Sequence, residues 1–253
     1  ESQLLSKERE CLKNLLNEFR DIFSKNDCDL GCSTGYQHEI NTENNKLVYT
    51  PPRKIPMHVE KDVDELLDKL ESKQIIQKVV SAWNSPLVIV PKKNGKIRIC
   101  VDFRKLNSIT TNEVYPIPDC NHLLESLNGN KYFSTLDLSM GFYQIPLNND
   151  DKKKTAFTTK RGQYAFTRMP FGLTGAPSSF QRVMTSILQQ QNWRICLIYL
   201  DDVIVFGKNM EDHCNNLKEV LQILKDAGIK LSPSKCNFFK RSVKYLGHVI
   251  DSN

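Results

Sequence analysis

Four stretches of the chain repeat apolar side chains at intervals of three and four residues, the spacing of one buried helix face. They cover residues 4–23, His58–Ser72, Ala176–Gln190 and Met210–Ala227, and Gly228 is suited to end the last of them. In the third helix the predicted inner residues are Phe180, Val183, Met184, Ile187 and Leu188. We therefore expect four amphipathic helices, each with one face against a core.

Shorter apolar runs between turn residues predict β-strands. Leu87–Val90 and Ile97–Val101 flank Asn94-Gly95, a strong hairpin-turn signal. Tyr132–Leu138 predicts a further strand, in which every residue except Asp137 is apolar or small.

Two more hairpins are predicted later in the chain, at Ile195–Phe206 and Cys236–Asp251. From Asn26 to Pro56 the periodicity is lost, and Gly, Asn, Thr and Pro accumulate, which is typical of an extended connector. Since strands and helices alternate without regular βαβ spacing, the expected fold class is α+β with an antiparallel sheet.

Composition and charge exclude few classes of function. The 253 residues carry a formal net charge of +6, which permits a polyanionic partner without requiring one. The chain opens on Glu1 without a signal-peptide pattern, and no run approaches the roughly 18 apolar residues that cross a bilayer. We therefore expect that the protein has no membrane partner. We also expect the chain to be a piece cut from a longer protein.

The eight cysteines lack the spacing of a disulfide framework. Cys100 and Cys196 lie in apolar runs and are predicted to be buried thiols in a reducing compartment. Cys28 and Cys32, followed by His38, are the one set that resembles zinc ligands, but a fourth ligand at zinc-finger spacing is missing.

Asp201 and Asp202 are adjacent acids inside the apolar segment Ile195–Phe206. They repel one another, and apolar neighbours disfavour their charged forms. A hard cation such as Mg²⁺, which prefers oxygen ligands, would relieve both effects. The competing interpretation is an ordinary acidic turn at the tip of a core hairpin.

A third acid, Asp137, ends the predicted strand Tyr132–Leu138. A strand-end Asp often caps a helix, and Asp137 or Ser139 could do so here. The alternative is a site in which carboxylates on neighbouring strands hold two cations about 3.5–4 Å apart, as in-line phosphoryl transfer requires. In that site Asp137 and Asp201 are expected to bridge the cations, with Asp202 a weaker ligand.

With these acids identified, the chain resembles the reverse transcriptases of gypsy-like LTR retrotransposons, and more distantly those of retroviruses. Five blocks occur in the order found in that family: Val101–Asn107, Leu136–Ile145, Met169–Pro177, Tyr199–Asp202 and Tyr245–His248. The resemblance covers roughly residues 36–251. It implies a right-hand polymerase, with fingers and an antiparallel palm sheet flanked by helices, on which a template–primer lies.

The resemblance assigns residues that bind the incoming nucleotide. Lys92 and Arg98 match basic residues of the fingers hairpin that hold the triphosphate. Phe142 matches the aromatic residue whose ring excludes a 2′-hydroxyl, and Phe171 matches a residue near the base and sugar. From the local sequence alone, Lys92 and Arg98 are equally well explained as solvated charges, and Phe142 as a core aromatic.

It also assigns residues near the reaction products and the primer. Lys235 matches the proposed general acid that protonates pyrophosphate, although a surface lysine in a loop explains it nearly as well. Tyr245, Leu246 and Gly247 match the hairpin that grips the primer terminus, where glycine permits close backbone approach. The basic positions Lys152–Lys154, Arg161 and Lys240–Arg241 are weaker candidates for phosphate contacts.

By the same resemblance, residues 1–56 form an N-terminal helix and connector. Residues 57–111 and 145–175 form the fingers, and residues 112–144 and 176–253 form the palm with the primer-grip hairpin. The thumb and ribonuclease H domain that follow in this family are expected to be absent from the chain.

The function expected from these residues is RNA-directed DNA polymerisation, with two Mg²⁺ ions, or Mn²⁺ in their place, acting on dNTPs and a template–primer of RNA or DNA. Other expected partners are the remaining Pol domains: protease, thumb and connection, ribonuclease H and integrase. The family's habit of copying RNA inside particles implies a cytoplasmic location. Two alternatives remain open: a catalytically silent or domesticated nucleic-acid-binding module of the same fold, and a zinc-binding interaction protein.

Overall fold

The computed structural model describes residues 6–26, 29–43, 47–91, 97–111 and 114–251. The chain divides into two compact units. The first contains residues 1–34, 115–141 and 180–253, and the second contains residues 35–114 and 142–179. Among the described residues, no helix has the length and apolar character needed to cross a bilayer.

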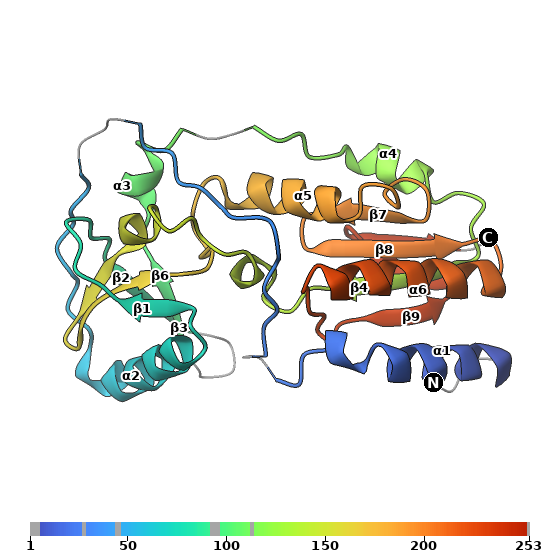
Figure 1. Cartoon of the computed structure of the whole chain (residues 1–253), viewed down its shortest axis with the longest axis horizontal. Coiled ribbons are helices and arrows are strands. Elements are labelled where there is room, and N and C mark those ends of the chain that lie inside the picture. The colour runs from blue at the N-terminus through green and yellow to red at the C-terminus, as the bar shows by residue number, and fades with distance from the viewer. Residues whose placement is uncertain (1–5, 27–28, 44–46, 92–96, 112–113, 252–253) are drawn as a thin grey trace. The chain divides into compact units, whose positions relative to one another are not determined.

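The first unit is built on a four-stranded antiparallel sheet in the order β7-β8-β4-β9 (Figure 1). Its strands are β4 (Tyr132–Asp137), β7 (Cys196–Tyr199), β8 (Asp202–Gly207) and β9 (Asn237–Lys240). A separate hairpin is made of β10 (Ser242–Tyr245) and β11 (His248–Asp251). The helical segments are α1 (Ser6–Glu18), the 3-10 helix η1 (Arg20–Ile22), α4 (Cys120–Glu125), α5 (Ala176–Ile187) and α6 (Met210–Asp226).

Strand β8 is covered on both faces, which explains its unbroken apolar sequence. Ile204 packs in a cluster with Phe133 of β4 and Tyr245 of β10. Val203 and Val205 point to the opposite face because successive strand residues alternate, and they are also fully buried. Helix α6 packs against β8 and β4 (Figure 1). The sheet is therefore held between two apolar layers.

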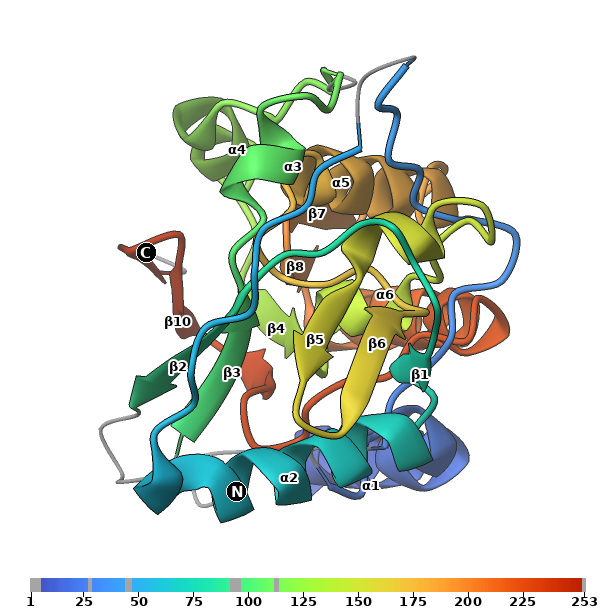
Figure 2. The same cartoon turned by 90° about the vertical axis from the view of Figure 1, so that its left-hand side faces the viewer.

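The second unit contains a two-stranded and a three-stranded antiparallel sheet (Figure 2). The two-stranded sheet is the hairpin of β2 (Leu87–Pro91) and β3 (Ile97–Val101), and the other has the order β1-β6-β5. The remaining elements are α2 (Met57–Ser72), β1 (Ile76–Lys78), α3 (Arg104–Asn107), η3 (Lys152–Thr155), β5 (Phe157–Thr159) and β6 (Gly162–Phe166). A further 3-10 turn, η2 (Gly141–Gln144), lies where the two units meet in sequence.

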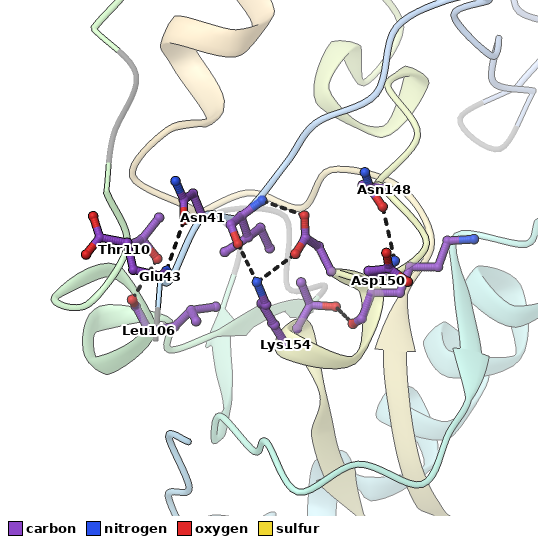
Figure 3. A network of polar contacts seen from close by, with 11 residues as sticks. Asn41, Glu43, Leu106, Thr110, Asn148, Asp150 and Lys154 are labelled. Atoms are coloured by element: carbon purple, nitrogen blue, oxygen red, sulfur yellow. Dashed lines mark hydrogen bonds and ion pairs between the residues drawn. The ribbon is translucent and has the colours of Figure 1, made fainter. Parts of the chain in front are cut away.

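The expected connector is divided between the units: Cys32 and Thr34 donate backbone hydrogen bonds to Gly228 and Ala227 of the first unit, and the residues after Thr34 belong to the second unit. The Ile40 N–H donates to Asp151 Oδ2 at 2.9 Å, and Lys154 Nζ donates to the Ile40 carbonyl at 2.6 Å (Figure 3). Lys154 also forms an ion pair with Asp151 at 2.7 Å. Further along, Arg53 reaches Asp102 at 3.0 Å. The connector is thus bonded into the second unit at Ile40 and Arg53.

Most sequence-predicted elements are present with slightly different ends, but three predictions need correction. The predicted hairpin Cys236–Asp251 is wrong, because β9 leaves it to pair with β4 and only β10 and β11 pair with each other. Helix α4, for which Asp119 supplies the N-cap by accepting from the Asn121 and His122 N–H groups, was not predicted.

The third correction concerns the cysteines. Cys11 of α1 and Cys214 of α6 form a disulfide, which their separation of 203 residues did not suggest. Cys196 is buried as expected, and burial raises the pKa of its thiol to about 12. Cys100 is only partly buried.

Candidate active site

The turn between β7 and β8 carries the two adjacent acids. Tyr199 pairs with Asp202 in the ladder, so Leu200 and Asp201 form a two-residue turn. Leu200 adopts a left-handed backbone with φ of 51°. Such φ values suit the twist of a two-residue hairpin, although Gly or Asn usually supplies them. The turn therefore places Asp201 at the tip of the hairpin and Asp202 on the first residue of β8.

Asp137 lies directly opposite Asp202 in the β4–β8 ladder. Opposed residues of an antiparallel pair point to the same face with Cβ atoms about 4.5–5.5 Å apart. Lys235 Nζ lies 3.2 Å from Asp137 Oδ1 and 3.4 Å from Oδ2. The structure thus brings three of the predicted catalytic residues, Asp137, Asp202 and Lys235, together at one end of the central strands β4 and β8, next to the Asp201 turn.

The surroundings of Asp201 disfavour its negative charge. Its Oδ1 is buried and finds no hydrogen-bond partner among the described residues. Burial, together with the charges of Asp202 and Asp137, raises the pKa of Asp201 to about 6. Burial and Asp137 also raise the pKa of Asp202, while Lys235 lowers it. The unpaired Asp201 oxygen and the mutual repulsion are what a bound cation would relieve.

The donor set fits a hard divalent cation, because every candidate ligand atom is a carboxylate oxygen. Asp137, Asp201 and Asp202 are the residues that would hold it. In the part of the chain that the structure describes, no three His, Cys, Asp or Glu side chains are gathered around one point in a way that could enclose a metal ion. In this arrangement the Lys235 ammonium group forms an ion pair with the Asp137 carboxylate.

Gly141, which sequence reasoning treated only as part of a motif block, is required by close packing. A Cβ atom at this position would lie 2.8 Å from Phe180 Cζ and 3.0 Å from Asp201 Oδ1. The first distance is shorter than real Cβ atoms show, and the second would require the Asp201 carboxylate to shift. Gly141 therefore leaves the space in which the Asp201 carboxylate sits.

In the second unit, Phe171 lies between the other nucleotide-binding candidates. The Arg98 guanidinium carbon lies 4.9 Å from the centre of the Phe171 ring, a cation–π contact. Phe142 packs against the same ring at 5.1 Å, and Tyr143 meets it edge-on at 5.3 Å. Arg98, Phe142 and Phe171 are thus brought together, whereas Lys92 lies outside the described residues.

The predicted primer-grip residues form the turn of the β10–β11 hairpin. Tyr245 is only 3% exposed, and its ring packs in the core cluster of the first unit. Leu246 and Gly247 have φ values of 50° and 84°, as a type I′ turn requires. A Cβ atom on Gly247 would meet nothing within 4 Å in the chain. Within the chain, glycine is needed here for its backbone conformation rather than for space.

Several basic residues proposed for phosphate contacts have partners inside the chain. Arg161 binds Asp68 at 2.6 Å, and Arg241 lies over the Tyr132 ring at 3.6 Å. Lys154 is held by Asp151 and by the connector, as described above. These contacts argue against the assignment of Arg161, Arg241 and Lys154 as free phosphate ligands.

The zinc alternative gains no ligand set from the structure. His38 Nδ1 lies 2.8 Å from Ser179 Oγ, so one ring nitrogen is engaged within the second unit. Cys32 carries an exposed thiol in the first unit, and Cys28 lies outside the described residues. The alternative therefore stays a prediction.

One residue near the acids escaped sequence reasoning altogether. Gln181 of α5 is buried, and its side-chain amide bonds the backbone on either side of Tyr199. The sequence could have indicated this residue, because Gln181 is a polar side chain three residues before Met184, on the helix face where α5 otherwise buries apolar residues.

Comparison with known proteins agrees with this arrangement. The family described as "Reverse transcriptase (RNA-dependent DNA polymerase)" matches residues 90–250. The Pol polyproteins of the Drosophila melanogaster transposons 297 and opus are 38% and 39% identical, over 94% and 97% of this chain. That of transposon gypsy is 37% identical over 95%. The chain spans about a quarter of the length of these curated relatives, covering 23%, 25% and 24% of them.

Solved structures show the same fold. A foamy viral protease–reverse transcriptase in complex with an RNA/DNA hybrid superposes with a TM-score of 0.90 at 25% identity, over 99% of this chain and 34% of that one. A second, in complex with double-stranded DNA, gives a TM-score of 0.90 at 26% identity, over 99% and 44%. With the motif order, the paired acids and these matches in agreement, the chain belongs to the reverse transcriptase family, beside the Pol polyproteins of Drosophila retrotransposons.

Proposed function

We propose that the chain is the fingers-and-palm core of an RNA-directed DNA polymerase that adds dNTPs to a primer 3′-hydroxyl at Asp137, Asp201 and Asp202. The observation that carries the proposal is the buried, unpaired Oδ1 of Asp201, which two neighbouring carboxylates hold in a strongly negative environment. A purely structural turn would gain nothing from this concentration of charge, whereas a cation-binding site depends on it.

The proposed cofactor is a pair of Mg²⁺ ions, or Mn²⁺ in their place, which when bound would lower the pKa of the attacking hydroxyl and stabilise charge on the leaving pyrophosphate. The carboxylates of Asp137, Asp201 and Asp202 would hold these ions. Lys235, whose side chain is 65% exposed, is the proposed proton donor to pyrophosphate.

The second unit is proposed to bind the incoming dNTP. Arg98 supplies a planar cation for the triphosphate and is steadied by the face of Phe171. Phe142, whose ring also packs against Phe171, presents the ring that excludes a 2′-hydroxyl. Lys92 is proposed as a second triphosphate ligand. We retain residues 57–111 and 145–175 as the proposed fingers, and residues 112–144 and 176–253 as the proposed palm.

The proposed partners are a template–primer of RNA or DNA and the other Pol domains: protease, thumb and connection, ribonuclease H and integrase. Related enzymes bound to an RNA/DNA hybrid and to double-stranded DNA support the first of these. We propose a cytoplasmic location, within a virus-like particle.

A second candidate is a catalytically silent nucleic-acid-binding module of the same fold. It is favoured by the ion pair between Lys235 and Asp137, which ties up one of the three acids, and by the lack of a closed ligand set among the described residues. In that case the fold binds a duplex but does not extend it.

Primer extension separates the two functions. The chain is given oligo(dT) on poly(rA) with dTTP and Mg²⁺ or Mn²⁺, and duplex affinity is measured in parallel. We expect extension by the wild type and by Asp150→Asn, which removes an exposed carboxylate outside the site, and none by Asp201→Asn. Duplex binding without extension, persisting when the chain is joined to the rest of a Pol polyprotein, would establish the silent module instead.

A further inference from the structure

Gln181 is a polar side chain on the buried face of α5. It is 1% exposed and precedes the fully buried Met184 and Leu188 by three and seven residues, so all three share one helix face. Burying an amide is unfavourable unless its donors and acceptors are paired. The partners of Gln181 therefore determine why an amide, and not an apolar side chain, stands at this position.

Both ends of the Gln181 amide bind the backbone that leads into the acidic turn. Its Oε1 accepts from the Leu200 N–H at 2.7 Å. Its Nε2 donates to the Ile198 carbonyl at 3.2 Å and to Thr185 Oγ1 at 3.3 Å. The amide thus bonds the backbone on both sides of Tyr199, as a neighbouring strand would.

Leu200 needs such support because its backbone is strained. Its φ of 51° lies in the left-handed region, which leucine rarely adopts and which Gly or Asn enters far more easily. Strained conformations persist where the surrounding structure fixes them, and they gather at functional sites. Here the hydrogen bond from Gln181 restrains the residue that immediately precedes Asp201.

The space next to Asp201 is restricted as well. The missing Cβ of Gly141 leaves room for Asp201 Oδ1, and the ring of Phe180, the neighbour of Gln181 in α5, lies against the same position. A change in the Leu200 backbone would move the carboxylate out of this position. The direction of the Asp201 side chain therefore depends on the backbone that Gln181 holds.

We infer that Gln181 is a positioning residue for Asp201: its side-chain amide holds Leu200 in the left-handed conformation and so aims the Asp201 carboxylate. The catalytic consequence rests on the proposed polymerase function, whereas the structural consequence does not. The two are therefore tested by separate measurements.

The structural test is amide hydrogen exchange at Leu200, measured by NMR on ¹⁵N-leucine-labelled protein without substrate or metal. Gln181→Met keeps the length of the side chain and removes all three hydrogen bonds of the amide, so Leu200 should exchange faster by about tenfold, the value of one net hydrogen bond. Gln181→Glu keeps an acceptor and should preserve protection. Gln189→Met, the same change at an exposed position of the same region, should leave exchange unaltered. Unchanged exchange in Gln181→Met would overturn the inference.

The catalytic test is primer extension with saturating and limiting dTTP. Displacing a catalytic group by about 1 Å lowers the rate on the order of 100-fold, so Gln181→Met should lower kcat by about 10- to 100-fold. The KM for dTTP and the duplex affinity should change less than about threefold, because the nucleotide-binding residues lie in the other unit.

Leu200→Gly distinguishes positioning from general packing. Glycine adopts the left-handed conformation without strain, so the loss caused by Gln181→Met should shrink several-fold when Leu200 is replaced by Gly. Equal losses in both backgrounds would mean that Gln181 only fills the core, and would overturn the inference. If wild type fails to extend a primer, the proposed function fails, and the exchange measurement alone decides whether Gln181 holds the turn.

Discussion

Replacing Asp201 by Asn should stabilise the metal-free protein at neutral pH while weakening its response to Mg²⁺. Burial and two neighbouring carboxylates raise the pKa of Asp201 from 3.8 to about 6. The folded chain therefore binds the Asp201 proton more tightly than the unfolded chain does. Above pH 6 the carboxylate is charged in both states, but only in the folded state is that charge buried and close to other carboxylates, so the folded state is destabilised.

The size of this loss of stability follows from the difference between the pKa of Asp201 in the unfolded chain, 3.8, and in the folded chain, about 6. At about 1.4 kcal/mol for each pH unit, the difference corresponds to about 3 kcal/mol of lost stability above pH 6. The loss is small near pH 4, where folded Asp201 is protonated, grows as the pH rises toward 6, and is nearly constant above the folded pKa. An asparagine removes the charge but leaves a buried amide imperfectly paired, which costs about 1–2 kcal/mol. The net gain expected for Asp201→Asn at pH 7.5 is about 1–2 kcal/mol.

Urea unfolding at pH 7.5 and pH 4.0, with EDTA and with Mg²⁺, tests this reasoning. Wild type should gain stability on adding Mg²⁺ at pH 7.5, and Asp201→Asn should gain less. The control is Asp150→Asn, which makes the same chemical change at an exposed position. If Asp201→Asn changes stability equally at both pH values, the raised pKa of Asp201 is refuted. An undiminished response to Mg²⁺ would show that the cations do not use this carboxylate.

Three further changes test other parts of the structure. Phe142→Ala should admit ribonucleotides while retaining dNTP incorporation in primer extension, and unchanged sugar discrimination would remove its role as a gate. Phe171→Leu should raise the KM for dNTP by about two- to fivefold, because the cation–π contact of Arg98 is lost, whereas Phe171→Tyr should not. Asp151→Ala should lower the free energy of unfolding by about 2 kcal/mol, since it releases the connector and Lys154, and a change below about 0.5 kcal/mol in urea would contradict that.

The β7–β8 hairpin was predicted nearly to the residue, because its signal is local. Two apolar runs separated only by two adjacent acids are typical of a buried hairpin that turns at the acids. The partner of β9 was not predictable in the same way. The sequence Asn237–Lys240 suits a strand, but its pairing with β4 joins residues about a hundred positions apart, and periodicity carries no information about such pairs.

The bonding of the connector to the rest of the chain was not predicted from its composition. Its Gly, Asn and Pro content correctly indicated that its described residues form no helix or strand, but its backbone groups bond to side chains such as Asp151 and Lys154. Such bonds leave no periodic pattern in either partner. The disulfide between Cys11 and Cys214 escaped prediction for the same reason, since connectivity cannot be read from spacing.

The candidate site shows where sequence reasoning stops and why. Adjacent acids at Asp201 and Asp202 indicate a cation, but only the structure identifies Asp201 Oδ1 as the oxygen without a partner. Two unfavourable features then coincide within two residues: the left-handed backbone of Leu200 and the raised pKa of Asp201. Each alone would be removed easily by a single substitution, to Gly in the first case and to Asn in the second. Their coincidence beside a buried glutamine argues that the turn is shaped for what it binds rather than for stability.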